Sequence, residues 1–269
     1  MNIIVCIKKI PDPEIPPAKF KLDSEAMRVI PPEGIPPVIS PYDAQAVELA
    51  IRLKEKHGGT ITVLSIDEEA SLKIVRHALS LGADEGIVLA DDAFAGSDSF
   101  AIAYILSQAI RKIGDFDLIL CGRQAADWDE GLVGSIIAQK LDLPLITLAE
   151  DIELTDSEPK TLRIKRVTLD GYQVFSATMP VVTTVSNEVG QPRLPSGWGI
   201  IAASKKEIQV WNASDLEADT SKLGPNASQR TLVKLFIPEQ KRECEILTAE
   251  TTAEAAIRLA ERLKEEGWV

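Results

Sequence analysis

The sequence predicts an α/β fold: a doubly wound, mostly parallel sheet with an antiparallel β extension and a long C-terminal arm that ends in a helix. Three observations predict it. Short runs rich in Ile, Val and Leu, typical of buried parallel strands, alternate with segments of helical apolar spacing. Strand-like runs with a hairpin signal follow after residue 150. The rest of the chain has little apolar periodicity until a final amphipathic helix.

Four apolar runs predict the buried strands. They are Asn2–Ile7, Thr60–Ile66, Gly86–Ala90 and Asp117–Cys121. Between them, apolar residues recur at helical spacing within residues 46–51, 72–79 and 102–109, which predicts crossover helices on both faces of the sheet. The candidate helix caps are residues whose side-chain oxygens accept bonds from unpaired first-turn amides. They are Ser40 or Asp43, Ser97 or Asp98, and Asp129.

Two regions depart from this alternation. The segment from Lys8 to Pro41 contains nine prolines, and we expect a long irregular excursion of the kind that serves a ligand or a partner. After residue 150, β-type runs surround an Asp170-Gly171 hairpin signal and predict antiparallel strands at one edge of the sheet. These runs are Thr161–Val167, Tyr172–Ser176 and Val181–Val185.

The C-terminal part predicts an appendage. Residues 190–230 are rich in Gly, Pro, Ser and Asn, and we expect them to bury little of themselves. Residues 251–266 have a helix pattern with charges on one face, which favours docking on another subunit. We therefore predict two domains, an α/β domain with its β extension over residues 1–190 and the arm over residues 191–269.

Composition narrows the class of protein. The 269 residues are 45% hydrophobic, enough for a substantial core, and the net charge of -12 disfavours a nucleic-acid partner. Three widely spaced cysteines indicate neither a disulfide framework nor a zinc site, which favours a reducing cytoplasm. No apolar run reaches the length of a membrane span, so we expect no membrane insertion.

The ligand crevice of an open parallel sheet lies at the carboxyl ends of its strands. That rule selects residues 6–8, 40–43, 65–68 and 121–134. In the last segment, CGRQAADWDEGLVG, a strand passes through an acidic loop into a helix that begins near Gly131 and Gly134. Free amides at such a helix start favour a phosphate, and the glycines permit its close approach. The alternative is that the glycines only allow a tight turn. The segment is neither a Walker motif nor G-x-G-x-x-G.

Other chemistry has weaker support. Asp127, Asp129 and Glu130 suggest a cation site, but capping and solvation account for them, and we predict no metal. His57 and His77 have no nucleophile motif beside them, so no catalytic residue is predicted and the chain is interpreted as a binding protein.

The assembled motifs resemble the beta subunit of electron transfer flavoprotein, from the first strand to the final helix. They are CIKKIPDPE, SPYDAQAVELAIRLKEK, ALSLGADEGIVL, DLILCGRQAADWDEGLVG, QPRLPSG and ASKKEI. The resemblance implies an adenine nucleotide alpha hydrolase-like fold and an electron carrier rather than an enzyme. It further implies a heterodimer with an alpha subunit that supplies most of the FAD site, and AMP bound structurally in this chain. Flavin dehydrogenases would donate electrons, and a quinone oxidoreductase or another acceptor would receive them.

By position, the resemblance assigns the nucleotide to the crevice that the strand-end rule selects. The implied ligands are Cys6, Ser40, Pro41, Tyr42, Asp43, Ile66, Gly122, Arg123, Gln124, Ala125, Asp127, Asp129, Glu130, Gly131, Leu132, Val133 and Gly134. The partner-recognition loop aligns with residues 194–200, where Leu194, Gly197 and Trp198 are the predicted contacts for a dehydrogenase.

Two alternatives stay open. Electron-bifurcating members hold a second FAD in this crevice and oxidise NADH; the phrase AFAGSDS resembles theirs, but Asp92 stands where they usually have Arg. Glu130 beside a pyrophosphate would be unfavourable, so we expect AMP. Ser40, where the family often has Asn, leaves one hydrogen-bond donor fewer for the nucleotide. A nucleotide-sensing protein of the universal-stress type would share the sheet but would not need the long arm.

Overall fold

The computed structural model describes residues 1–67, 72–155, 160–238 and 244–268, and the chain forms two compact units, Met1–Lys234 and Leu235–Val269. The predicted division after residue 190 differs from this one, because residues 191–234 contribute a strand and two α-helices to the first unit. Within the described residues, none of the helices is both long and apolar enough for a membrane span.

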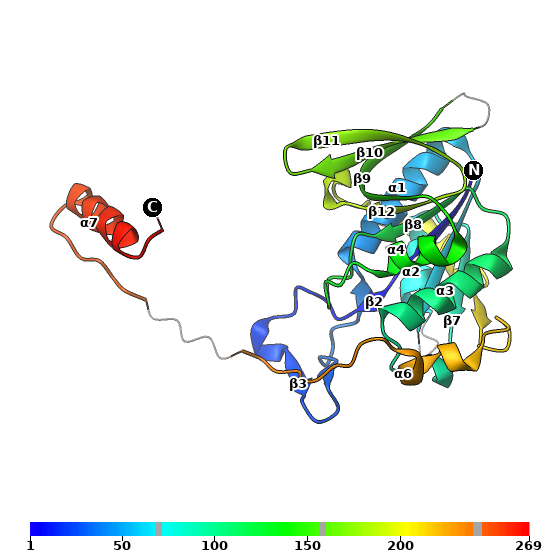
Figure 1. The fold of residues 1–269 in the computed structure, drawn as a ribbon, viewed down its shortest axis with the longest axis horizontal. Coiled ribbons are helices and arrows are strands. Elements are labelled where there is room, and N and C mark those ends of the chain that lie inside the picture. The colour runs from blue at the N-terminus through cyan, green and yellow to red at the C-terminus, as the bar shows by residue number, and fades with distance from the viewer. Residues whose placement is uncertain (68–71, 156–159, 239–243, 269) are drawn as a thin grey trace. The chain divides into compact units, whose positions relative to one another are not determined.

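A nine-stranded sheet forms the centre of the first unit, in the order β11-β10-β9-β12-β8-β1-β6-β7-β13 (Figure 1). Neighbouring strands from β9 to β13 in this order are parallel, and β10 and β11 are antiparallel at one edge. The strands are β1 (Asn2–Cys6), β6 (Thr60–Ile66), β7 (Glu85–Leu89), β8 (Leu118–Gly122), β9 (Leu145–Leu154), β10 (Thr161–Thr168), β11 (Gly171–Thr178), β12 (Val181–Val185) and β13 (Gln209–Trp211).

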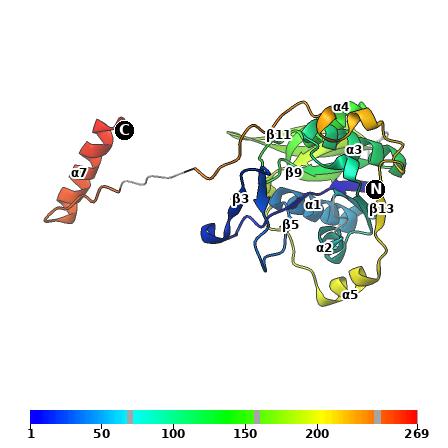
Figure 2. The same cartoon turned by 90° about the horizontal axis from the view of Figure 1, so that it is seen from below.

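Helices cover both faces of this sheet (Figure 2). Alternate residues of β1 show the two layers, since Ile3 and Val5 pack with α1 and α2, whereas Ile4 and Cys6 pack with α3 and α4. This arrangement confirms the predicted doubly wound α/β fold. The helices are α1 (Pro41–His57), α2 (Lys73–Leu81), α3 (Ser99–Ile113), α4 (Val133–Leu141), α5 (Gly197–Lys205), α6 (Gly224–Ala227) and α7 (Thr252–Glu265).

Two expectations about strands need correction. β12 was predicted as an antiparallel edge strand, but it runs parallel between β9 and β8, where all five of its residues are buried. The segment from residue 8 to residue 41 is irregular only in part. It contains the 3-10 turn Pro17–Lys19 and two short antiparallel pairs. The pairs are β2 (Lys9–Ile10) with β5 (Val38–Ile39), and β3 (Lys21–Asp23) with β4 (Arg28–Ile30).

Residues 190–230 bury more than their composition predicts. α5 packs on α2, where the Arg76 guanidinium donates to the Ala203 carbonyl at 2.5 Å, and β13 pairs with β7. Leu216 and Leu223 insert singly into the core beside α3. The burial was missed because isolated apolar residues between turns leave no periodic pattern.

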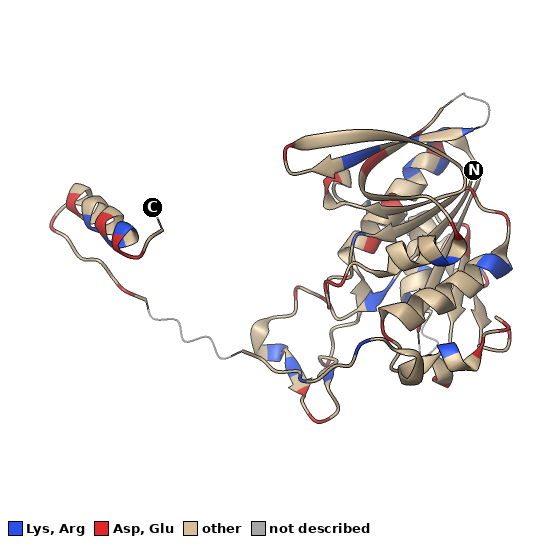
Figure 3. Ribbon diagram, in the orientation of Figure 1, with Lys and Arg blue, Asp and Glu red and all other residues tan. Residues whose placement is uncertain are grey.

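α7 lies in the second unit, and it confirms the predicted final helix. The Thr251 hydroxyl caps it by accepting from the Glu254 amide at 3.2 Å. None of its residues is buried, and three apolar side chains, Ile257, Leu259 and Leu263, are exposed. Lys and Arg are interspersed with Asp and Glu along its surface, as they are over the elements of the first unit (Figure 3).

Candidate functional site

Asp43, in the first turn of α1, joins the carboxyl ends of two adjacent strands. Its Oδ2 accepts from the Lys8 amide at 2.8 Å and its Oδ1 from the Gly122 amide at 2.9 Å. Burial of the carboxyl raises its pKa to about 7, although the two backbone bonds oppose that rise. The expected cap of α1 is therefore not made: Ser40 is the N-cap residue without a side-chain capping bond, and Asp43 points to the strands.

Gly122 is required by this contact. A Cβ atom at that position would lie 2.4 Å from Asp43 Oδ1 and 2.8 Å from the carbonyl carbon of Tyr42. No side chain fits there without displacing the start of α1. The glycine therefore lets α1 approach the end of β8 closely enough to form the floor of the predicted crevice.

The other predicted residues of the floor lie at the carboxyl ends of neighbouring strands. Cys6 ends β1 and stands directly opposite Cys121 of β8, and Ile66 ends the next strand, β6. Both cysteines are buried; the Cys6 thiol and the burial itself raise the pKa of the Cys121 thiol well above its ordinary value. Ser40, just before Pro41, is also buried, and its hydroxyl accepts from the Ala126 amide at 3.4 Å.

The loop between β8 and α4 is held by its own side chains. The Arg123 guanidinium lies 5.0 Å from the centre of the Tyr42 ring and donates to Asn187 Oδ1 at 2.9 Å. Gln124 Nε2 donates to Asp129 Oδ1 at 2.7 Å, and Asp129 has a positive φ of 53°. Asp129 therefore turns the chain, and the prediction that it caps α4 is wrong, since the N-cap residue is Leu132.

Cations from outside the loop neutralise its other acids. Lys8 Nζ lies 2.7 Å from Asp127 Oδ2. Arg230 Nη1 lies 2.6 Å from Glu130 Oε1, and the second oxygen of Glu130 accepts from the Ser99 hydroxyl. Lys8 lies in the strand-end segment 6–8 that the sequence selected, although the resemblance did not assign it to the nucleotide. Arg230 stands far from Glu130 in the sequence and left no spacing signal.

The pairing of Glu130 changes the electrostatic argument about the nucleotide. The sequence argument treated this carboxylate as a charge that would oppose a pyrophosphate. Its side chain is 27% exposed and carries an ion pair and a hydroxyl bond, so its net repulsion of an anion is reduced. The charge of Glu130 therefore no longer separates AMP from a second FAD.

The start of α4 is where the sequence predicts an anion. Leu132 is the N-cap residue and makes no side-chain capping bond, so the first-turn amides, beginning at Val133, have no acceptor from that residue. Gly131 has a positive φ of 65°, and a Cβ at Gly134 would lie 2.8 Å from Thr184 Cγ2. Each glycine thus has a structural reason of its own, independent of a phosphate.

Other possible sites lie elsewhere. Leu194 lies just before α5, and Gly197 and Trp198 lie in its first turn; the side chains of Leu194 and Trp198 are 90% and 82% exposed. α5 packs on α2, and the segment before it packs on α1.

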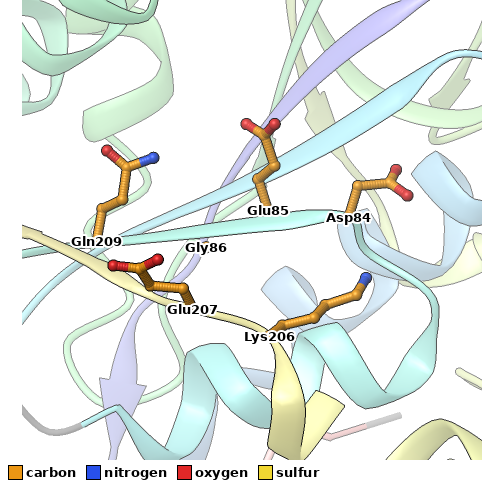
Figure 4. A pocket seen from close by; sticks show the side chains of 6 residues that line it. All are labelled: Asp84, Glu85, Gly86, Lys206, Glu207 and Gln209. Carbon is orange, nitrogen blue, oxygen red and sulfur yellow. The ribbon is translucent and has the colours of Figure 1, made fainter. Parts of the chain in front are cut away.

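A cavity of about 380 Å³ lies at the opposite, amino ends of β7 and β13. Figure 4 shows that the side chains lining it are mostly acidic or amide, which is an unfavourable environment for a phosphate. In the part of the chain that the structure describes, no group of three or more His, Cys, Asp or Glu is arranged to hold a metal ion.

Comparisons with known proteins identify the family. Residues 29–216 match the model of the electron transfer flavoprotein domain. The chain is 40% identical to an electron transfer flavoprotein subunit beta of Thermoanaerobacterium thermosaccharolyticum, over 98% of each chain. It is 36% identical to the caffeyl-CoA reductase-Etf complex subunit CarD of Acetobacterium woodii, over 99% of each chain, and 32% identical to the protein FixA of Azorhizobium caulinodans, over 99% of this chain and 95% of the relative. The chain therefore belongs to the electron transfer flavoprotein beta subunit family.

Proposed function

We propose that this chain, as an electron carrier subunit in the cytoplasm, binds AMP at the start of α4 and pairs with an FAD-bearing alpha subunit. The observation that carries the proposal is the uncapped start of α4, which opens at the crevice edge built by Asp43 and Gly122. Lys8 and Arg230 pair with two acids of the loop before α4, Asp127 and Glu130. Arg123 adds a third cation to the same loop, where it donates to the Asn187 side chain. First-turn amides with nearby cations suit a phosphate, and the residues present therefore fit a nucleotide.

In this proposal the FAD held with the alpha subunit supplies the redox chemistry, and this chain breaks no bond. Its residues hold the AMP phosphate at the first-turn amides of α4, with the remaining ligands drawn from the predicted site list. The exposed Leu194 and Trp198 form the contact for a flavin dehydrogenase, and the complex passes its electrons to a quinone oxidoreductase or another acceptor. The exposed apolar residues of α7 dock on the alpha subunit.

A second candidate function is a bifurcating flavoprotein, in which the crevice holds a second FAD and NADH is oxidised. Two observations favour it. One relative belongs, by its name, to a caffeyl-CoA reductase-Etf complex, and Glu130 is neutralised by Arg230 rather than left to repel a pyrophosphate. The family match, which extends through α5 to residue 216, argues against a nucleotide-sensing protein of the universal-stress type.

The test is the nucleotide content of the purified heterodimer. The chain is co-expressed with its alpha subunit, the complex is denatured, and the released nucleotides are separated and counted. One FAD and one AMP per heterodimer is the expected result. Two FAD and no AMP would replace this proposal with the bifurcating one, and FAD alone would refute nucleotide binding by this chain.

A further inference from the structure

The root of the C-terminal arm, residues 228–230, is hydrogen-bonded to Asp98, the N-cap residue of α3. Asp98 Oδ2 accepts from the backbone amides of Gln229 at 2.6 Å and Arg230 at 3.0 Å, while its Oδ1 caps α3. In return the Asp98 amide donates to the Ser228 hydroxyl at 3.1 Å. These bonds fix the backbone of the arm root, although Gln229 and Arg230 are exposed.

The side chain of Arg230 extends from this root to the loop before α4. Its guanidinium lies 2.6 Å from Glu130, and the Ser99 hydroxyl holds the second oxygen of the same carboxylate. Glu130 stands two residues before the N-cap of α4, Leu132. One cation on the arm root therefore balances the acid next to the predicted phosphate position.

We propose that Arg230 is a positioning residue for nucleotide retention: it holds and neutralises Glu130, so that a phosphate stays bound at the start of α4. This inference rests on the proposed function. Without the guanidinium, Glu130 would be a partly buried, unbalanced anion close to a second anion, and such repulsion is stronger there than in bulk water. With it, the local charge of the pair is close to zero.

The position of Arg230 gives the pairing a further consequence. The residue lies near the end of the first unit, at the root of the segment that leads to α7. Whatever moves residues 228–230 also moves the guanidinium, and hence changes the charge felt by the nucleotide. By linkage, a bound nucleotide stabilises the fastened position of the root by the same free energy.

The experiment measures AMP dissociation from the full-length heterodimer, at low and at high salt. The variants are Arg230→Gln, Glu130→Gln and the double variant. Arg163→Gln is the matched control, because Arg163 also pairs with a glutamate, at 3.7 Å, but between the antiparallel strands β9 and β10. We expect Arg230→Gln to release AMP about tenfold faster than the wild type, within the usual range of coupling energies. The control should release it at the wild-type rate.

The double variant separates charge from structure. Glu130→Gln in the Arg230→Gln background removes the unbalanced carboxylate, and we expect it to restore the rate to within about threefold of the wild type. High salt should shrink the difference between Arg230→Gln and the wild type. A double variant as fast as Arg230→Gln, or an Arg230→Gln variant as slow as the wild type, would overturn the inference alone. A wild-type heterodimer that holds no AMP would refute the proposed function, and this inference with it.

Discussion

Replacing Gly122 by alanine tests the close approach of α1 to β8. The new methyl carbon would lie 2.4 Å from Asp43 Oδ1 and 2.9 Å from the Asp43 amide nitrogen, both far inside van der Waals contact. The start of α1 must move away. That movement stretches or breaks the 2.9 Å bond from the Gly122 amide to the buried carboxylate.

The expected loss of stability has two parts. Overpacking of a tight site costs about 1–3 kcal/mol. Above pH 7, where the Asp43 carboxyl is ionised, losing a hydrogen bond to this buried acceptor costs about 1.5–3 kcal/mol. Together they predict that Gly122→Ala lowers the free energy of unfolding by about 3–6 kcal/mol, a large fraction of the stability of an ordinary domain.

Urea unfolding followed by far-ultraviolet circular dichroism measures this loss. Gly197→Ala is the matched control, since a Cβ at Gly197 meets no atom within 4 Å and its φ is not positive. Alanine in that helical position should change stability by less than about 1 kcal/mol. If Gly122→Ala unfolds at the same urea concentration as this control, the contact between Gly122 and Asp43 does not have the importance assigned to it.

Three further predictions follow from the same structure. Burial raises the pKa of Asp43 from 3.8 to about 7, so between these pH values the folded chain binds more protons than the unfolded chain, and stability falls as the pH rises. Asp43→Asn should flatten this dependence of stability on pH, measured as melting temperatures from pH 4 to pH 8. An unchanged dependence would contradict the assignment. Of the three cysteines only the exposed Cys244 should react quickly with a thiol reagent in the native chain, the other two reacting only after denaturation. Arg193, in the segment before α5, pairs with the buried Glu48 at 2.9 Å between Nε and Oε2. Arg193→Gln removes this ion pair and should make the segment more sensitive to protease than Arg163→Gln does.

The sequence predicted the parallel core well because its signal is local. The run Thr60–Ile66 has the same bounds as β6, and Asp98 caps α3 as expected, since both depend on neighbouring residues alone. β12 was misplaced for the opposite reason. Its position between β9 and β8 is decided by pairing with strands distant in sequence, which no local pattern records.

The same distinction holds for the candidate site. That residues 6–8, 40–43 and 121–134 meet at the carboxyl ends of the strands could be predicted, because strand ends and helix starts are local features that topology then brings together. The partners of the acids could not. Arg230 reaches Glu130 across a third of the chain, and Asp43 leaves the expected capping position to bond Lys8 and Gly122.

The two bonds of Asp43 also have a consequence for folding. They span 35 and 79 residues of sequence, so the crevice floor is complete only when β8 has joined β1. Contacts between such distant residues form late, after the entropy of closing the intervening loops has been lost. A nucleotide that binds only the completed floor would then stabilise the last step of folding, and the yield of folded chain should rise with its concentration during refolding.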